Sequence, residues 1–383
     1  MRIHLLTAGF RSANGRAFLY PLLVHRPFLA HQGIHWRAFT AIEPQLFDCD
    51  QLWIDSKFHR DRWQQEHAQV LDELQRLRHQ AQRLVFVDLG DNSSYLVSEV
   101  LPLVDLYCKS QLLRDRQRYL QPLYGYRPYT DFYHHRFGVT DSAPAAPIFV
   151  TEPQWLTKLH LAWNSGLSDY SATAPWRLAL YRHLPITALL RWPIPITPAT
   201  APRSQPLSCR ITTHYDRATV AFQRQQISQR LSHLLSHDRV SRRRYLQELA
   251  RSRVVLSPFG WGEIAYRDFE TFLSGALLLK PDMSHMETWP DFFIDGQTMV
   301  AFRWDLQDLE QRLEQLWSQP QYCIDLAAAG QEHYRQHLHT TTTAAELFYQ
   351  QLQRIIAAAA PLNKTGTAPC PPPWPDTSPH RLS

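Results

Sequence analysis

Cysteine is scarce in this chain and shows no metal-binding spacing. The 383 residues contain five cysteines, which are scattered, odd in number and without a Cys-x-x-Cys motif. Such usage argues against a disulfide framework and against a structural zinc, and it is typical of a reducing compartment. We therefore expect a protein of the cytoplasm.

Long apolar runs are missing as well. No stretch approaches the roughly 20 consecutive apolar residues of a membrane-spanning helix, and the apolar run in residues 1–10 is too short for a secretory signal. Residues 175–196 combine Trp, Leu and Arg with four prolines. That composition fits a segment lying on a membrane surface, and it equally fits a buried connecting helix broken by proline. A peripheral position at the inner face of a membrane is therefore left open.

Cofactor and metal motifs are also lacking. The loop at residues 11–16 follows the first predicted strand, but it lacks the Gly-x-Gly-x-x-Gly fingerprint of NAD-binding proteins and the Gly-x-x-x-x-Gly-Lys-Ser/Thr sequence of P-loops. The chain shows no Asp-x-Asp triplet that would bind a catalytic metal. His134 and His135 have no further ligands at a convincing spacing. We expect neither a cofactor nor a metal.

What the chain does contain is a globular composition. Hydrophobic residues make up 44% of it, which is enough for two domains of ordinary size to bury a core each. The net charge is +5, from 40 Lys and Arg against 35 Asp and Glu. So mild an excess does not indicate a nucleic-acid partner, but it suits anionic substrates or a membrane surface.

Strand and helix patterns alternate along the first half of the chain. Short β-rich runs predict strands at residues 1–10, 34–39, 50–54, 84–87 and 104–107. Helices are predicted at residues 59–82 and 155–170. This alternation is typical of a parallel sheet covered by helices.

A Pro-rich segment, residues 197–206, divides the chain. We predict an N-terminal domain at residues 1–204, a C-terminal domain at 205–358 and a disordered tail at 359–383. The C-terminal domain is expected to begin with a strand at residues 209–215.

The most informative stretch of the second domain is residues 253–290. A β-rich run, 254–256, leads into a loop with Gly260 and Gly262, and a helical pattern is expected from Glu263 to about Gly275. A second apolar run, 276–279, follows. This order of strand, loop, helix and strand is the unit of a parallel α/β sheet.

The loop and the start of this helix suit a phosphate ligand. Two glycines let the backbone approach a ligand closely, and a helix N-terminus offers unpaired N–H groups with a partial positive charge. The spacing predicts that Arg267 lies beside Glu263 and Glu270 on one helix face. Those carboxylates can accept hydrogen bonds from ribose hydroxyls, or all three side chains can form a solvated ion-pair ladder. Both interpretations stay open on the pattern alone.

The stretch resembles the donor-binding half of GT-B glycosyltransferases of the group 1 superfamily, which includes the spore-coat-type enzymes. The matching segments are Gly260-Trp261-Gly262-Glu263, Arg267-Asp268-Phe269-Glu270 and Gly275-Ala276-Leu277, and the similarity covers most of residues 205–355. The resemblance implies an α/β fold of two Rossmann-like domains facing across a cleft. It further implies that the C-terminal domain holds a nucleotide-diphospho-sugar.

The resemblance also implies roles for individual residues. The donor-binding set would be Gly260, Trp261, Gly262, Glu263, Arg267, Glu270 and Arg217. The phosphates would lie at the Gly260–Glu263 helix start and the ribose at Glu270, and Arg267 or Arg217 would stabilise the leaving group. The loop residues Asn14, Gly15 and Arg16 would border the cleft.

Two acidic residues, Asp88 and Asp91, follow the predicted fourth strand. Site residues gather at the carboxyl ends of strands in open α/β sheets, so either carboxylate can serve as the base that deprotonates an acceptor hydroxyl. The alternative is an Asx turn or a helix N-cap.

The residues and the resemblance together predict a metal-independent, hexosyltransferase-like enzyme. It would transfer a sugar from a nucleotide-diphospho-sugar to a hydroxyl of a glycan, lipid or small molecule, as in the synthesis of cell-envelope polysaccharide. Two alternatives stay open, namely a non-catalytic module of the same fold that binds a nucleotide or a partner, and a sugar-nucleotide epimerase.

Overall fold

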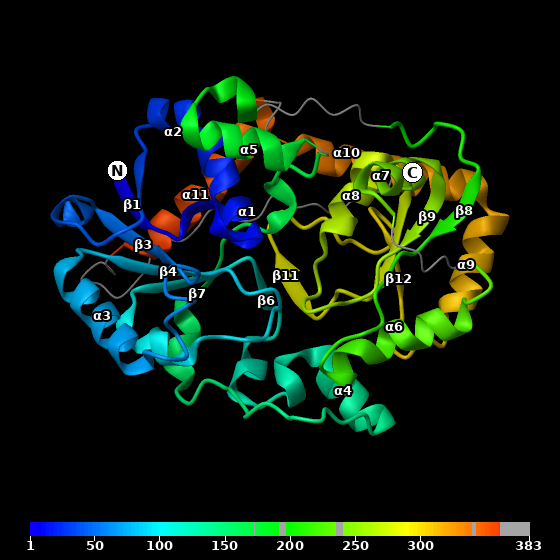
Figure 1. The fold of residues 1–383 in the computed structure, drawn as a ribbon, viewed down its shortest axis with the longest axis horizontal. Helices are drawn as coiled ribbons and strands as arrows, with labels where there is room; N and C mark the ends of the chain where they lie inside the picture. Colours follow the sequence, from blue (N-terminus) through cyan, green and yellow to red (C-terminus); the bar gives the residue numbers. More distant parts are fainter. Residues whose placement is uncertain (172, 191–196, 235–239, 339–341, 361–383) are drawn as a thin grey trace, which may run out of the picture.

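The structure is a computed structural model that describes residues 1–171, 173–190, 197–234, 240–338 and 342–360. Two α/β lobes lie side by side, and each contains a parallel β-sheet with helices packed against it (Figure 1). The expected fold class, two Rossmann-like domains, is confirmed. The predicted tail lies, from residue 361 onward, outside the described residues.

The first lobe is built on a six-stranded parallel sheet in the order β2-β1-β3-β4-β5-β7. The strands are β1 (Arg2–Leu6), β2 (His35–Phe39), β3 (Gln51–Asp55), β4 (Leu84–Asp88), β5 (Leu106–Lys109) and β7 (Leu159–Leu161). β3, β4 and β5 are buried along their whole length, because layers of packed chain cover both faces of the sheet.

Helices cover the two faces of this sheet. α1 (Ala13–Val24), α2 (Arg26–His31) and α11 (Thr342–Ala358) lie on one face, and α3 (His67–Gln80) lies on the other. Successive strand residues point to opposite faces, so the residues of each strand divide between two hydrophobic cores.

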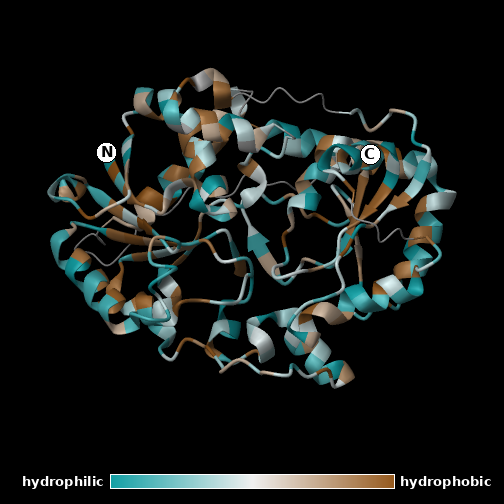
Figure 2. Ribbon diagram, in the orientation of Figure 1, coloured by the Kyte–Doolittle hydropathy of each residue, from teal (hydrophilic) through white to brown (hydrophobic). Residues whose placement is uncertain are grey.

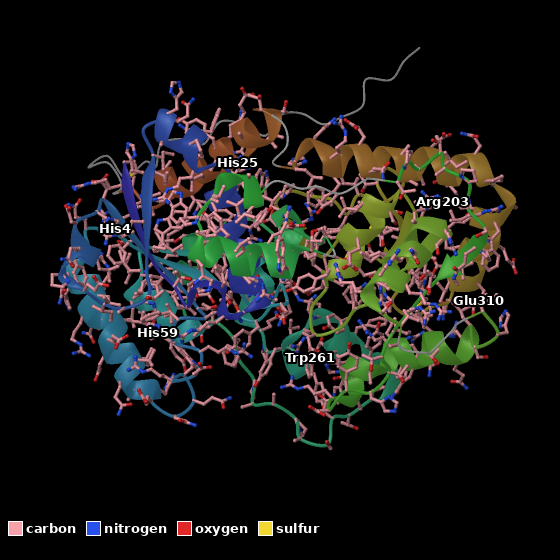
Figure 3. The ribbon with its side chains drawn as sticks, turned by 45° about the horizontal axis from the view of Figure 1, so that its top comes forward. His4, His25, His59, Arg203, Trp261 and Glu310 are labelled. Atoms are coloured by element: carbon pink, nitrogen blue, oxygen red, sulfur yellow. The ribbon has the colours of Figure 1, made fainter. Side chains whose placement is uncertain are left out.

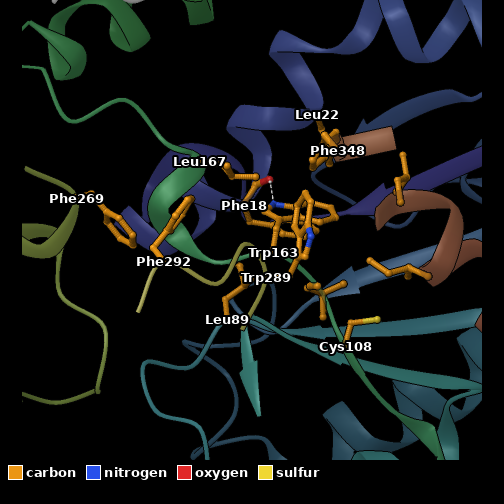
Figure 4. Packing of buried hydrophobic residues seen from close by; sticks show 14 of the residues in the cluster. Phe18, Leu22, Leu89, Cys108, Trp163, Leu167, Phe269, Trp289, Phe292 and Phe348 are labelled. Atoms are coloured by element: carbon orange, nitrogen blue, oxygen red, sulfur yellow. Dashed lines mark hydrogen bonds between the residues drawn. The ribbon is translucent and has the colours of Figure 1, made fainter. Parts of the chain in front are cut away.

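The core under α1 and α11 is rich in aromatic side chains (Figure 4). The rings of Phe18 and Trp163 stack with their centroids 4.7 Å apart. The indole Nε1 of Trp163 donates a hydrogen bond of 3.0 Å to the carbonyl oxygen of Phe18. Phe348 of α11 packs edge-on against the same indole, at 4.9 Å. This core therefore fixes α1, and with it the loop that precedes α1.

The second lobe holds a four-stranded parallel sheet in the order β12-β10-β9-β8. Its strands are β8 (Gln205–Ser208), β9 (Ser252–Leu256), β10 (Leu277–Pro281) and β12 (Val300–Phe302). Its helices are α6 (Ala218–Arg230), α7 (Arg242–Arg251), α8 (Tyr266–Ser274), α9 (Leu309–Ser318) and α10 (Pro320–Gln336). The strands of the two sheets are mainly hydrophobic, whereas the surrounding helices carry many hydrophilic residues (Figure 2).

Pairs of elements outside the two sheets help to join the lobes. β6 (Gln111–Leu113) of the first lobe pairs antiparallel with β11 (Met286–Thr288) of the second, and this pair lies between the lobes (Figure 1). α4 (Pro128–Phe137) packs against α6. The two lobes therefore meet around the space onto which the carboxyl ends of their strands open.

Two helix predictions for the first half of the chain are wrong. One segment forms a strand in place of a long helix, and one helix begins later than predicted. Residues 155–170 form no long helix, because β7 pairs with β5 in their middle, and this tertiary pairing overrides local helical spacing. The helix expected from residue 59 begins at His67. The ring of His59 is buried in the preceding turn, with Nε2 2.7 Å from Glu73 Oε1.

The first strand of the second lobe also differs from the prediction. It is β8, at residues 205–208, and not the run at 209–215. β8 is fixed by parallel pairing with β9, in which Leu207 lies opposite Val254. The residues after β8 run as irregular chain toward α6 and toward the space between the lobes.

Helix α11 crosses back to the first lobe, although the predicted division places residues 342–358 in the second domain. Gln351 Nε2 donates to the carbonyl oxygen of Leu161 at 2.8 Å, and Gln51 Nε2 donates to that of Ile356 at 2.9 Å. The apolar side of α11 fills the core under β1 and β3. The domain boundary at 204–205 stays a prediction.

The segment flagged as a membrane-surface candidate is described only up to residue 190. It forms α5 (Ala174–His183) and a short 3-10 turn. Leu178 is buried with Leu190 against α1, whereas Trp176 is 66% exposed. Among the described helices, none is long and apolar enough to cross a bilayer.

One buried histidine gives the fold a pH dependence. His25, labelled in Figure 3, follows α1 and stacks on Phe348 of α11 with the ring centroids 5.2 Å apart. Burial lowers the pKa of His25 from 6.5 to about 4. The unfolded chain therefore binds a proton more readily than the folded chain between these two values, so this residue makes stability fall as the pH falls from 6.5 toward 4.

We expect the His25→Gln variant to lose part of this acid sensitivity. The wild-type free energy of unfolding should drop between pH 7 and pH 4.5 by about 2–3 kcal/mol more than that of the variant. Urea denaturation at both pH values measures the difference. Equal pH slopes for the two proteins would show that His25 does not contribute.

Candidate functional site

A cavity of about 490 Å³ lies between the lobes. The first lobe contributes the loops after β1, β3 and β4, and the second lobe contributes the loop after β9 and the start of α8. The cavity therefore lies at the carboxyl ends of the parallel strands, which is where open α/β sheets bind ligands. The expected cleft between two facing domains is present.

The loop Gly260-Trp261-Gly262 forms one wall of the cavity. Gly262 lies so close to the first lobe that an added Cβ would be 1.7 Å from the backbone oxygen of Asp91. Trp261 lies at the junction of the lobes, where it is 40% exposed (Figure 3). The Arg127 guanidinium lies 5.3 Å from the centroid of its ring. The loop thus bridges the lobes and also lines the space between them.

Helix α8 begins at Tyr266 and not at Glu263, which corrects the predicted helix start. Ala265 is the N-cap, and its backbone N–H donates to Asp268 Oδ2 at 2.8 Å. Both Ala265 and Tyr266 line the cavity. The positive end of the helix dipole therefore faces the cavity, three residues later than expected.

Glu263 is held outside the helix by the first lobe. Its carboxylate accepts hydrogen bonds from the Ser93 backbone N–H at 3.0 Å and from Ser93 Oγ at 2.7 Å, and His285 Nε2 lies 3.6 Å away. Burial raises the pKa of Glu263, but the contacts with His285 and Ser93 outweigh burial, so the pKa is lowered overall. Glu263 is fully buried and does not line the cavity. The structure gives it a role in joining the lobes.

Arg224 of α6 lines the cavity as a buried cation without an acidic partner. It is 8% exposed, and its Nε donates to the carbonyl oxygen of Phe259 at 2.5 Å. Its guanidinium lies 5.2 Å from the Tyr215 ring centroid. No carboxylate among the described residues pairs with it, and burial lowers its pKa. An anion in the cavity would supply the missing counter-charge.

The predicted ion-pair face of α8 does not form. Because Glu263 lies outside the helix, Arg267 has no glutamate on that side, and its Nη2 donates to the backbone oxygen of Arg210. Glu270 pairs with Arg242 of α7, with Nη1 and Oε1 2.8 Å apart. Neither Arg267 nor Glu270 lines the cavity. The role of Arg267 in stabilising the leaving group and the role of Glu270 in binding the ribose stay predictions.

Arg217 lies at the start of α6, outside the cavity lining. Its Nη1 donates to the Gly125 backbone oxygen at 3.2 Å, and its guanidinium lies 5.3 Å from the Tyr126 ring centroid. The Asp141 carboxylate caps α6 by accepting from the Thr219 backbone N–H at 2.9 Å. The N-terminus of α6 is therefore occupied by the protein itself.

Of the predicted loop residues, Asn14 lines the cavity, and Gly15 and Arg16 do not. Gly15 is required where α1 begins, because an added Cβ would lie 2.8 Å from the Gly9 backbone oxygen. Arg16 Nη1 donates to the backbone oxygen of Phe10 at 3.1 Å. These two residues shape the loop that carries Asn14.

The two candidate bases have different surroundings. Asp91 lines the cavity, and its Oδ1 accepts a hydrogen bond of 2.6 Å from Asn14 Nδ2. Asn14 Oδ1 in turn accepts from the Tyr266 hydroxyl of the second lobe, at 3.0 Å. A chain of polar groups thus runs from α8 through α1 to Asp91.

Asp88 is buried below the cavity. It is 2% exposed, and its Oδ2 accepts from Lys109 Nζ at 2.6 Å and from the Tyr107 hydroxyl at 2.8 Å. Its Oδ1 accepts from the Gly90 backbone N–H at 2.8 Å. This is the Asx turn that the sequence offered as the alternative to a catalytic base. Asp88 therefore stabilises the loop, and Asp91 faces the space where a substrate would lie.

Sequence reasoning missed several groups at the cavity. Lys57 and Arg60 line it from the turn after β3, Gln111 lines it from β6, and Tyr266 and Tyr215 line it from the second lobe. Lys57 could have been found by its place after a predicted strand, which is the rule that found Asp91. The other four depend on how the lobes meet.

Asp48 and Asp50 have the spacing of an Asp-x-Asp triplet but lie elsewhere. Asp48 Oδ1 accepts from Arg2 Nη1 at 2.7 Å, and Asp50 Oδ2 accepts from the Arg2 backbone N–H at 2.7 Å. Arg2 begins β1, and the cavity lies beyond the other end of that strand. These carboxylates therefore hold the amino end of the sheet.

Comparison with known proteins agrees with the resemblance. Residues 209–349 match a family model described as glycosyl transferase-like. That segment runs from the residue after β8 into α11 and includes the loop after β9, all of α8 and Arg224. No curated protein matches the chain.

Solved structures of similar fold share little sequence with the chain. HepE of Anabaena in complex with UDP is 10% identical over 93% of this chain and 99% of its own, with a TM-score of 0.43. Sucrose-phosphate synthase of Thermosynechococcus elongatus is 12% identical, with coverages of 94% and 100% and a TM-score of 0.43. A glycosyltransferase of Rickettsia africae is 8% identical, with coverages of 93% and 98% and a TM-score of 0.44.

Proposed function

We propose, from the match of residues 209–349 to the glycosyl transferase-like family model, that this chain is a glycosyltransferase with a nucleotide-diphospho-sugar donor. The donor diphosphate would lie against Arg224 and the start of α8. The acceptor hydroxyl would approach from the wall that carries Asp91. Glycans, lipids and small molecules all remain candidate acceptors.

The uncompensated charge of Arg224 carries this proposal. A buried guanidinium without an acidic partner is costly, and here it lines the cavity that also receives the positive end of α8. A diphosphate offers oxygens to both, because guanidinium groups bind phosphate well and helix N-termini attract anions. Two independent features of the second lobe therefore favour the same ligand chemistry.

The same groups can assist bond cleavage. When the anomeric C–O bond breaks, its electron pair stays on the diphosphate oxygen, so the leaving nucleoside diphosphate gains negative charge. Arg224 and the α8 N–H groups would stabilise that charge from the cavity wall. We propose that this arrangement removes the need for a metal ion.

Asp91 would take the acceptor proton. The acceptor oxygen then forms its new bond to the anomeric carbon, and the proton leaves on the Asp91 carboxylate. Asn14 orients that carboxylate through the 2.6 Å hydrogen bond to Oδ1. A module that only binds nucleotides would need no carboxylate on this wall, so the placement of Asp91 favours the enzyme.

Calorimetric titration of the full chain with UDP, GDP, ADP and TDP, without added metal, tests the proposal. We expect one diphosphate to bind in the micromolar range and more weakly as salt is added, because salt screens the long-range attraction between the anionic ligand and the positive cavity wall. Radiolabelled sugars of that nucleotide, with water as acceptor, should then be hydrolysed slowly.

Each other result has a defined meaning. Absence of binding for every diphosphate would contradict the donor site. Tight binding without hydrolysis would favour the non-catalytic module, and interconversion of the bound sugars would favour an epimerase.

A further inference from the structure

The wall of the cavity that belongs to the first lobe carries two cations of its own. Lys57 and Arg60 both line the cavity, from the turn that follows β3. The donor assignment does not use them, because Arg224 and the start of α8 belong to the second lobe. Their presence on the opposite wall therefore needs a separate explanation.

The turn that presents these side chains is anchored from below. Asp55, the last residue of β3, is fully buried, and its Oδ1 accepts from the backbone N–H of Lys57 at 2.8 Å and of Phe58 at 3.1 Å. The Arg60 backbone N–H donates to the Lys57 oxygen at 3.3 Å. The backbone of the turn is thus fixed, while the charged ends of both side chains are left available.

Among the described residues, neither Lys57 nor Arg60 forms an ion pair or a side-chain hydrogen bond. Lys57 has a longer-range electrostatic interaction with the buried Asp55 carboxylate. Arg62, two residues later, behaves differently. Its Nε pairs with Glu66 Oε2 at 2.6 Å and its Nη1 with Glu73 Oε2 at 3.2 Å. The cation that does not line the cavity is therefore neutralised by the protein, and the two that line it are not.

The charge balance of this wall is positive. Asp91 is the acidic residue among the groups that line the cavity, against Lys57 and Arg60 on the same lobe. Asp91 would also be neutralised when it takes the acceptor proton. The wall is therefore complementary to an anion next to the reacting hydroxyl.

We propose that the acceptor carries an anionic group, a phosphate or a carboxylate, which Lys57 and Arg60 bind. This inference rests on the proposed function, because it treats the first-lobe wall as the acceptor side. Arg60 can bind such a group through two parallel hydrogen bonds, and Lys57 adds a point charge. The acceptor class is thereby narrowed to sugar phosphates, sugar acids and diphosphate-linked glycans.

A binding experiment tests this with the donor site already filled. The full chain is saturated with the nucleoside diphosphate that binds best and is then titrated with inorganic phosphate, glucose 6-phosphate, glucuronate and neutral glucose. We expect the anionic probes to bind at least about tenfold more tightly than glucose. A glycan carried on a polyprenyl diphosphate in detergent is a further probe, and tighter binding of it than of glucose 6-phosphate would identify a lipid-linked acceptor.

Matched variants separate charge from folding. The double variant Lys57→Gln/Arg60→Gln should lose the preference for anionic probes, and Lys57→Arg/Arg60→Lys should keep it. Arg76→Gln, an exposed cation on α3, controls for general surface charge.

Two results would overturn the inference. One is equal affinity for glucose and the anionic probes in the wild type. The other is an unchanged preference in the glutamine double variant. Failure of the proposed function is distinguishable, because it would appear in the first step as absence of nucleoside diphosphate binding.

Discussion

Replacing Arg224 with glutamine is expected to lower kcat/KM for the nucleotide-sugar by about 10²–10³-fold, the range found when one group that stabilises developing charge is removed. The reason is that its guanidinium lines the cavity without any acidic partner among the described residues, so its charge is available to the diphosphate. Steady-state kinetics with the donor identified by titration measures this effect.

The Arg224→Gln substitution should not destabilise the fold, although it lowers activity. Burial already disfavours the charge of Arg224, so its removal is expected to leave the Tm unchanged or to raise it. Arg230→Gln is the matched control, since Arg230 lies on the last turn of the same helix and pairs with Glu310 at 3.5 Å. Equal kinetics for the two variants would mean that the diphosphate binds elsewhere.

Replacing Asp91 with asparagine is expected to lower kcat by about 10²–10⁴-fold, because a positioned general base contributes that much. Asparagine has nearly the same shape and can keep a hydrogen bond to Asn14, so donor affinity and Tm should change little. Transfer assays with single-turnover kinetics, together with thermal denaturation, test both parts of this expectation.

Asp88→Asn provides the contrast. Lys109 is fully buried and pairs with Asp88 at 2.6 Å, so loss of the carboxylate leaves a buried cation uncompensated and should cost about 3–5 kcal/mol of folding free energy. The two aspartates lie three positions apart, yet one substitution should affect the reaction and the other the fold. A stable but inactive Asp88→Asn variant, or an unstable Asp91→Asn variant, would contradict the assignment.

The sequence predicts the architecture well where local pattern and tertiary structure agree. Residues 84–87 of β4 are an apolar run in a sheet covered on both faces, so their burial follows from their composition, whereas β3 also buries the polar residues Gln51 and Asp55. The rule that ligands lie at the carboxyl ends of parallel strands finds Asp91 and Asn14. Gly260 and Gly262 are found because glycine allows a close approach of backbone.

Where the prediction fails, tertiary contacts decide the outcome, within a lobe for β7 and β8 and between the lobes for Glu263. Glu263 has the spacing of a helical residue, but two hydrogen bonds from Ser93, 170 positions away, hold it outside the helix. That single displacement moves the helix start to Tyr266 and separates Glu263 from Arg267. No local pattern contains this information.

The choice between two arginines illustrates the same limit. Arg217 and Arg224 are seven residues apart, a spacing that would put them on one face of a continuous helix. Arg217 is the N-cap of α6 and not part of its body, so it points to Gly125 and Tyr126, whereas Arg224 reaches the cavity. Sequence spacing makes both arginines candidates for phosphate binding. Only the position at which α6 begins shows that Arg224, and not Arg217, lines the cavity.

The return of α11 to the first lobe makes that lobe discontinuous in sequence. Its sheet comes from residues before 162, but Phe348, Leu352 and Ile355 complete the core under β1 and β3. A polypeptide that ends at residue 204 would therefore expose the apolar surface that α11 covers and should associate with other chains. Supplying residues 342–358 as a separate peptide would restore the layer that α11 forms over β1 and β3 and should reduce that association.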